Sequence, residues 1–294
     1  MGIGNWKKWP IETIKKEDNR FPRQLSEIKQ CPPALYYRGV WNETIFEKTI
    51  SIVGSRRMTK YGQTVIDKIL PDLVAAKTTI ISGFMYGVDS QAHRQCMEMG
   101  GKTVAVLAGG LDYLLPPEND SLYSLILETG GLVISEYEAG FKPTLWSFPQ
   151  RNRIVSGLAT LGVLVVEAAI DSGSLITAQF ATKQGRDLFA IPGPITSSTS
   201  AGCNLILKNG KAKMVTEASD ILKSNDKPSI QINYLDDLNS TERTIVKLLG
   251  AEALSMDELC RMINKRANEI GSTLGILGIK GIVEESAGSY YLKK

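Results

Sequence analysis

The stretch that decides the fold reads Thr49-Ile50-Ser51-Ile52-Val53-Gly54-Ser55-Arg56-Arg57, and an amphipathic pattern over Tyr61–Ala76 follows it. Its first five residues form a nearly continuous β-branched run, which is typical of a strand buried on both faces. A second apolar run, Thr79–Ser82, comes after the amphipathic segment. Strand, helix and strand in this order predict two parallel strands joined by a right-handed crossover.

The same alternation continues along the chain. Four more apolar runs and four more helical patterns follow: Thr103–Ala108, Leu132–Ser135, Gly162–Glu167 and Leu188–Ile191 as strands, and Val88–Met99, Ser121–Thr129, Asn152–Ala159 and Ser174–Gln184 as helices. This order predicts an α/β fold with an extended, Rossmann-like parallel sheet and helices on both faces. Ligands of such sheets bind outside the carboxyl ends of the strands.

The two ends of the chain have other patterns. Residues 1–45 combine tryptophan, proline and basic residues, which predicts a basic arm or cap on a Rossmann-like domain at 46–223. Residues 224–238 are rich in turn formers and predict a linker. In residues 239–294, Ser240 and Ser255 are candidate N-caps of two helices, and a third helix is expected over 267–277. A turn at Ala287-Gly288 predicts a β-hairpin, and three helices before a hairpin predict a winged-helix domain.

Composition narrows the class of protein. Of 294 residues, 43% are hydrophobic and 22% are charged, which is ordinary for a globular chain. No apolar run approaches the roughly 18 residues of a membrane span, and the first ten residues lack the apolar core of a secretory signal. The four cysteines form no CxxC pair, so we expect neither a disulfide framework nor a metal site. This use of cysteine predicts a location in the reducing cytoplasm.

The charge is unevenly distributed. Residues 1–40 carry 8 basic and 4 acidic residues, residues 41–234 carry 18 of each, and residues 235–294 carry 8 and 9, which sums to the net charge of +3. The neutral middle nevertheless contains two basic clusters, one at Arg56, Arg57 and Lys60 and one at Arg151 and Arg153. Arginine binds phosphate through two hydrogen bonds, so a local polyanion site is compatible with a nearly neutral chain.

Five predicted strand ends supply glycine, serine or arginine, and Phe148 adds an aromatic face for stacking. Taken singly, each of these turns is a weak signal, and the one at Gly54–Arg57 has a second interpretation as a glycine turn with surface arginines. Together they predict a continuous groove for a polyanion. Its candidate residues are Gly54, Ser55, Arg56, Arg57, Lys60, Ser82, Gly83, Phe148, Arg151, Asn152, Arg153, Ser172, Gly173, Ser174 and Thr177.

Motifs of common enzyme classes are missing. The GxxxxGK[ST] pattern of nucleoside triphosphatases and a strand-linked GxGxxG of dinucleotide enzymes do not occur in the sequence. His93 is the single histidine, and it follows Asp89 by four residues on one helix face, which favours a structural role over catalysis. No catalytic residue is predicted, and we expect a binding protein rather than an enzyme.

In order and spacing, residues 50–222 resemble the DprA (Smf) family of DNA-processing proteins. The matching blocks include Gly54-Ser-Arg56, Ser82-Gly83, Gly109-Gly-Leu-Asp112, Arg151-Asn-Arg153, Ser172-Gly-Ser-Leu-Ile-Thr177 and Gly202-Cys-Asn204. The resemblance implies binding and protection of single-stranded DNA, a homodimer, and delivery of RecA recombinase to that DNA during natural transformation. It implies no cofactor, and the winged-helix tail matches an accessory domain of many members.

Leu115-Pro116 replaces the family's usual Tyr-Pro, and two further positions depart from the pattern in charge: Asp171 stands where lysine or arginine is common, and Tyr86 where arginine is usual. Both changes remove positive charge. The alternative function is a nucleotide phosphoribohydrolase of the lysine-decarboxylase-like family, whose Pro-Gly-Gly-x-Gly-Thr-x-x-Glu block the sequence lacks. Because the tail of residues 235–294 has a net charge of −1, we interpret it as a protein-contact module, with weak DNA binding as the second interpretation.

Overall fold

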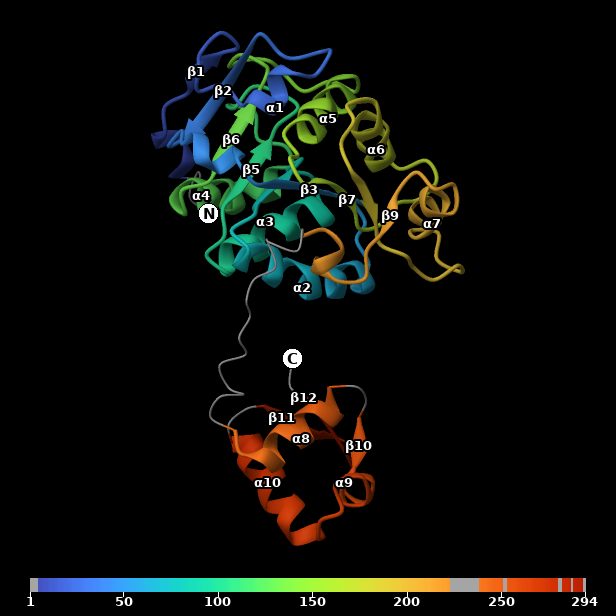
Figure 1. Ribbon diagram of the computed structural model, residues 1–294. Helices are drawn as coiled ribbons and strands as arrows, with labels where there is room; N and C mark the ends of the chain where they lie inside the picture. The colour runs from blue at the N-terminus through green and yellow to red at the C-terminus, as the bar shows by residue number, and fades with distance from the viewer. Residues whose placement is uncertain (1–4, 223–237, 251–252, 280–281, 287, 293–294) are drawn as a thin grey trace. The chain divides into compact units, whose positions relative to one another are not determined.

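The computed structural model describes residues 5–222, 238–250, 253–279, 282–286 and 288–292. The chain divides into two compact units, residues 1–228 and 229–294. The first unit is built on a nine-stranded sheet with the order β1-β2-β6-β5-β4-β3-β7-β8-β9 (Figure 1). A mixed α/β unit with a large sheet, followed by a small helical and β unit, confirms the predicted fold class.

Seven strands of this sheet are parallel: β3 (Thr49–Val53), β4 (Thr79–Ser82), β5 (Thr103–Val106), β6 (Leu132–Ser135), β7 (Gly162–Val165), β8 (Leu188–Ala190) and β9 (Lys213–Met214). Every residue of β3 to β8 is buried, as the continuous apolar runs predict. The strand order runs from β3 to β6 in one direction and from β7 to β9 in the other. The order therefore reverses beside β3, and such a reversal places a crevice at the carboxyl ends of the strands.

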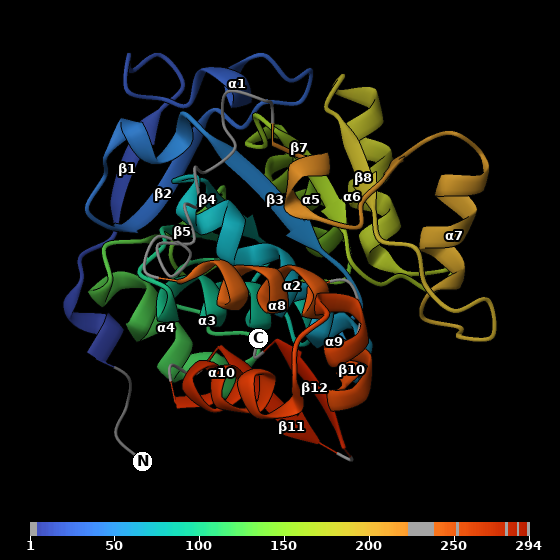
Figure 2. The ribbon, with the colours of Figure 1, turned by 60° about the horizontal axis from the view of Figure 1, so that its bottom comes forward.

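Helices cover both faces of the sheet (Figure 2). They are α2 (Lys60–Ala75), α3 (Val88–Glu98), α4 (Asp120–Glu128), α5 (Ser147–Gly157), α6 (Gly173–Lys183) and α7 (Ala201–Lys208), with 3-10 turns η1 (Asn5–Lys8), η2 (Glu43–Phe46), η3 (Pro117–Asn119) and η4 (Ala218–Asp220). Side chains of β3 alternate between the faces: Ile50 and Ile52 pack with α2 and α3, and Val53 packs with α5 and α6. This two-sided packing explains why the strand is apolar throughout.

The helix α5 begins five residues earlier than the sequence pattern predicts. Its start at Ser147 is stabilised because the Ser147 hydroxyl donates to the Thr144 carbonyl and accepts from the Thr144 amide, at 2.9 and 3.0 Å. Pro149 falls in the first turn, where a missing amide hydrogen does no harm. The prediction of a start at Asn152 is therefore wrong, and Arg151 and Arg153 lie inside the helix.

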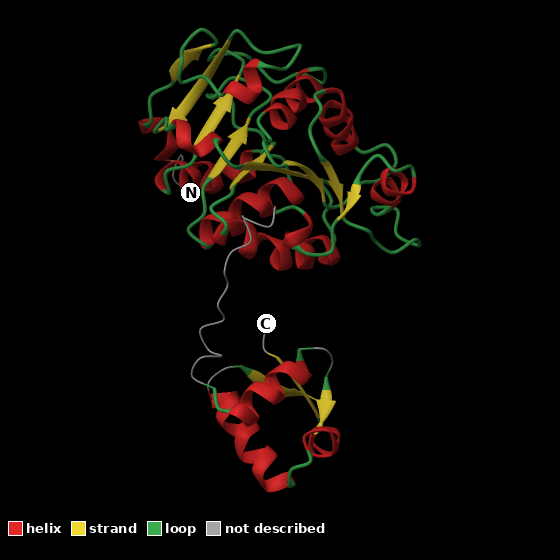
Figure 3. Ribbon diagram, viewed as in Figure 1, coloured by secondary structure: helices red, strands yellow, loops and turns green. Residues whose placement is uncertain are grey.

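The second unit contains α8 (Ser240–Leu249), β10 (Leu254–Ser255), α9 (Met256–Ile263), α10 (Ala267–Ile279), β11 (Val283–Ser286) and β12 (Ser289–Leu292), shown as helices and strands in Figure 3. Ser255 caps α9 as predicted, with Glu258 completing a capping box. The cap of α8 is Asn239 rather than Ser240, because the Asn239 side chain accepts the amides of Thr241 and Glu242. The predicted linker at 224–238 lies, except for Leu238, outside the described residues, and so does Ala287 of the predicted turn.

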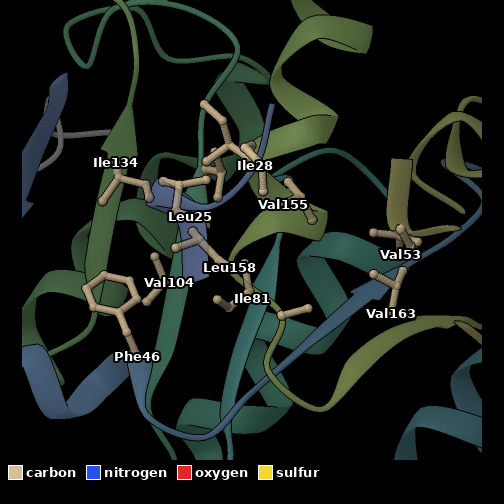
Figure 4. Close-up of a cluster of buried hydrophobic side chains, with 14 of the residues drawn as sticks. Leu25, Ile28, Phe46, Val53, Ile81, Val104, Ile134, Val155, Leu158 and Val163 are labelled. Atoms are coloured by element: carbon tan, nitrogen blue, oxygen red, sulfur yellow. The ribbon is translucent and has the colours of Figure 1, made fainter. Parts of the chain in front are cut away.

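The segment predicted as a basic arm contributes to the sheet. Strand β2 (Ala34–Gly39) pairs antiparallel with β6, and β1 (Glu12–Lys15) pairs antiparallel with β2. The short helix α1 (Arg23–Ser26) lies between them and packs on α5: Figure 4 shows Leu25 and Ile28 among side chains of the core. At Gly157 of α5 an added Cβ would lie 2.9 Å from the Leu25 side chain, so the two segments are in close contact.

Replacing Leu25 by alanine tests this packing. Leu25 is 0% exposed, and truncating such a side chain costs about 2–5 kcal/mol of unfolding free energy. All four tryptophans lie before residue 147, so tryptophan fluorescence during a urea titration reports on the unit of residues 1–228. We expect a clearly lower midpoint for Leu25→Ala and a nearly unchanged one for Leu125→Ala, whose side chain is 38% exposed. Equal midpoints would contradict the packing.

Candidate nucleic-acid interface

A cleft of about 930 Å³ opens where β3 and β4 end and where α5 and α6 begin. It lies at the carboxyl edge of the sheet, beside the reversal of strand order. Twelve of the fifteen predicted residues line it: Gly54, Ser55, Arg56, Arg57, Gly83, Phe148, Arg151, Asn152, Ser172, Gly173, Ser174 and Thr177. The fold thus brings predicted residues from four separate segments of the chain together.

The loop after β3 carries two exposed arginines. The guanidinium of Arg56 lies over the ring of Phe148, with its central carbon 5.5 Å from the ring centroid. The Ser55 hydroxyl accepts the amide of Arg57 at 3.0 Å, and the Ser55 carbonyl accepts the amide of Val88 at 3.2 Å. These bonds fix the loop against the start of α3, so both arginine side chains extend from an anchored backbone.

The N-terminus of α6 lies at the cleft. Ser172 is the N-cap of α6, and its hydroxyl lies 2.8 Å from the hydroxyl of Ser174. Both residues line the cleft, which places a helix N-terminus with its amide groups at the cleft wall. The N-terminus of α2 is arranged differently: it is capped by Thr59, whose amide donates to the buried Glu167 carboxylate at 2.9 Å.

Arg151 forms part of the cleft floor. It is 3% exposed, and its Nη1 donates to the carbonyls of Gly83, which follows β4, and of Val106, the last residue of β5. Its Nε donates to Asn152 Oδ1 at 3.2 Å, and the Asn152 amide donates to the Gly173 carbonyl at 3.3 Å. Burial lowers the pKa of Arg151 to about 10, so the guanidinium remains charged at neutral pH.

One buried carboxylate accompanies this guanidinium. Asp89 is 8% exposed and accepts the amide of Met85 at 3.3 Å. Burial raises the pKa of Asp89, and the positive charge of Arg151 opposes that shift. Gly83 leaves room for both groups, because an added Cβ would lie 2.6 Å from the Asp89 oxygen and 2.8 Å from the Arg151 guanidinium. The side chains that line the cleft therefore include three arginines and one buried carboxylate.

The structure does not bring three of the predicted residues to the cleft. Ser82 is fully buried and donates to the Ile52 carbonyl at 2.6 Å. Arg153 is 4% exposed and forms a bidentate pair with Glu136, at 3.0 and 2.6 Å. Lys60 is exposed at the start of α2, outside the residues that line the cleft. Positions 151 and 153 differ in direction because residues two apart on a helix do not share a face.

Sequence reasoning missed several residues that line the cleft. Ser198 and Thr199 belong to a polar run that follows β8, and the strand-end argument applied to that run would have found them. Leu145, which is 93% exposed, has no recognisable signal in the sequence. The missed residues are Val53, Thr59, Met85, Asp89, Leu145, Pro149, Val155, Ala169, Ile176, Ser198 and Thr199.

The described residues offer no accessible histidine, metal site or membrane-spanning helix. His93 is 0% exposed, with Nδ1 2.6 Å from the Thr103 hydroxyl, and burial lowers its pKa to about 3. The imidazole is thus neutral near pH 7 and sealed from the cleft. Among the described residues, no group of three or more His, Cys, Asp or Glu side chains could hold a metal ion. None of the helices in these residues is long and apolar enough to cross a membrane.

Comparison with known proteins identifies the family. The model of the family "DNA recombination-mediator protein A" matches residues 12–226, and that of the "DprA winged helix domain" matches residues 234–289. Protein Smf of Synechocystis is 33% identical over 319 aligned positions, which cover 96% of this chain and 80% of that protein. DNA processing protein DprA of Streptococcus pneumoniae is 42% identical over 217 positions, covering 74% of each chain.

Solved structures agree with this assignment. The X-ray structure of the S. pneumoniae protein matches with a TM-score of 0.66 and 40% identity, over 74% of each chain. A structure of DNA processing protein A from Helicobacter pylori, described for its unique single-stranded DNA binding mode, matches with a TM-score of 0.64 and 27% identity, over 79% of this chain and 98% of that one. With its main unit and its tail both matched, the chain belongs to the DprA (Smf) family of DNA-processing proteins.

Proposed function

We propose that the chain binds single-stranded DNA in the cleft without catalysing a reaction on it, and that it protects this DNA during natural transformation. The observation that carries the proposal is the pair of Arg56 and Phe148, a cation over an aromatic ring at 5.5 Å beside Arg57 and Arg151. The DNA-binding mode described for the H. pylori relative supports it.

The side chains of the cleft are suited to binding a DNA strand without sequence specificity. The exposed arginines and the N-terminus of α6 offer charge and donors to phosphate groups, which carry no sequence information. Phe148 offers a stacking face, and every base has an aromatic face to stack on it. Binding of this kind tolerates any sequence and weakens as salt concentration rises.

The family also suggests partners. We propose a homodimer that delivers RecA recombinase to the bound strand, in the cytoplasm; these points rest on the family alone. Size-resolved light scattering of the chain with and without a single-stranded oligonucleotide measures the oligomeric state, and RecA filament assembly on that DNA measures delivery. A monomer in both samples, or assembly at an unchanged rate, would contradict the corresponding point.

Nucleotide hydrolysis is the alternative, and no observation favours it. Its family places a glutamate after a glycine-rich block, whereas Ser172-Gly-Ser-Leu-Ile-Thr177 has none in that position. Incubation with nucleoside monophosphates should release no free base. Released base that increases with protein concentration would support the enzyme instead.

Arg56→Ala should weaken binding to all single-stranded sequences alike, because Arg56 contacts phosphate rather than base edges in this proposal. We expect the slope of log affinity against log salt to decrease by about 0.7, the value for one phosphate contact on a single strand. Fluorescence anisotropy with labelled oligonucleotides at several salt concentrations measures both quantities. Lys68→Ala, on the exposed side of α2 outside the cleft, is the control. An effect of the same size in the control, or a preference for duplex DNA in the wild type, would refute the assignment.

Phe148→Ala should leave the salt slope almost unchanged, because no phosphate contact is removed. Loss of one stacking partner costs about 1–3 kcal/mol, which is about 5- to 150-fold in affinity. Phe148→Tyr keeps the aromatic face and should bind nearly as well as the wild type. The same anisotropy titrations decide the matter: tight binding by Phe148→Ala would show that no base stacks there.

Removal of residues 230–294 should leave single-strand affinity within about twofold, because every residue that lines the cleft precedes residue 200. The shortened chain keeps the whole of the first compact unit, residues 1–228. Circular dichroism establishes its folding before the titration. A large loss of affinity in a folded, shortened chain would assign DNA contacts to the winged-helix unit.

A further inference from the structure

A second hollow lies beside α5 and α6, with lining residues separate from those of the cleft. It has a volume of about 400 Å³ and is enclosed by the segment after α1, by α5 at Arg153, and by the end of α6. Figures 1 and 2 both show α1 beside α5, and a hydrogen bond from Arg186 to the Gln24 carbonyl joins α1 to the turn after α6. We call this space the α6 hollow; it has no lining residue in common with the cleft.

The α6 hollow has an excess of positive charge. Four of its lining residues are cationic, namely Lys29, Arg153, Lys183 and Arg186, and its only acidic lining residue is Glu27. The Glu27 carboxylate lies 3.3 Å from the guanidinium of Arg23, so its charge is already partly balanced.

Two of these cations are fixed and two are exposed. Arg153 is held by the bidentate pair with Glu136, and Arg186 donates to the Gly157 carbonyl at 3.1 Å. Each of these two guanidinium groups has a buried Nε without a hydrogen-bond partner. Lys29 and Lys183 are exposed, and within the described residues neither ammonium group has an ion-pair partner. The hollow thus combines fixed charges in its wall with two ammonium groups available to an anion.

The uncharged part of the wall consists of Ile28, Phe180 and the amide side chains of Gln30 and Gln184. Phe180 of α6 supplies an aromatic ring to the hollow, and the buried Ile28 supplies an apolar side chain. An aromatic ring beside several cations is the combination that holds a nucleotide, with the base stacked and the phosphate paired. A volume of about 400 Å³ lies within the range of small-ligand sites, roughly 300–1,000 Å³.

We propose that the α6 hollow is a second nucleotide-binding site, with phosphate at Lys29 and Lys183 and the base against Phe180. Along α6, Phe180 follows the cleft residue Thr177 by three residues, about 4.5 Å of helix. One helix therefore carries both sites, and the nucleotide we favour is a further unit of a strand that occupies the cleft. If the nucleotide belongs to a bound strand, the proposal rests on the proposed function of the cleft. A free nucleotide offers the same phosphate and base and is the second candidate source of the ligand.

The test is the double variant Lys29→Glu/Lys183→Glu. Its control is Lys15→Glu/Lys68→Glu, which makes the same charge change at exposed positions outside both sites. Thymidine oligonucleotides of about 6 and about 20 units bracket the usual footprint of single-strand sites. We expect the double variant to bind the long oligonucleotide about tenfold more weakly than the control, with a salt slope lower by about 1.4, and the short one equally well.

Thymidine monophosphate distinguishes the two sources. A calorimetric titration that shows binding to wild type and to Arg56→Ala, but not to Lys29→Glu/Lys183→Glu, assigns the α6 hollow to a free nucleotide. The proposal is overturned if the double variant matches the control for the long oligonucleotide and for thymidine monophosphate. If the wild type binds neither oligonucleotide, the proposed function of the cleft fails, and the monophosphate titration still decides the α6 hollow.

Discussion

Arg151 places a positive charge beneath the cleft and connects α5 to the ends of two strands. Transfer of a guanidinium out of water costs several kcal/mol, and here two backbone carbonyls, Asn152 and the nearby Asp89 carboxylate offset that cost. Gly83 is part of the same arrangement, since any side chain at that position would displace Arg151. The start of α5, and with it Phe148, is therefore positioned by a buried charge rather than by apolar packing alone.

The exposed arginine side chains of the cleft are less constrained than the buried Arg151. Arg56 and Arg57 extend from a loop that is anchored by Ser55, so their backbone is ordered while their side chains can adjust to a strand. At physiological salt, charges farther away than about 8–10 Å are largely screened. The net charge of +3 therefore says little about binding, and the three arginines of the cleft say more.

Much of the fold could be predicted from the sequence, because the strands β3 to β8 are buried on both faces and leave continuous apolar runs. Strands β1 and β2 were missed, since an edge strand such as Glu12–Lys15 is mostly exposed and is defined by its distant partner. At the candidate site, the predicted strand ends identified the loops after β3, β4 and β7, which line the cleft. They could not show that Arg153 faces Glu136, because that direction depends on where α5 begins.

The first turn of α6 forms part of the cleft through its main chain as well as its side chains. Amide groups at a helix N-terminus belong to the backbone, so they persist through almost any substitution that leaves the helix intact. Arginine contacts can be lost in one mutational step, whereas this contribution to anion binding cannot. In the proposed function, substitutions at Arg56 and Arg57 would thus change the affinity of the cleft above a level that the polypeptide chain itself maintains.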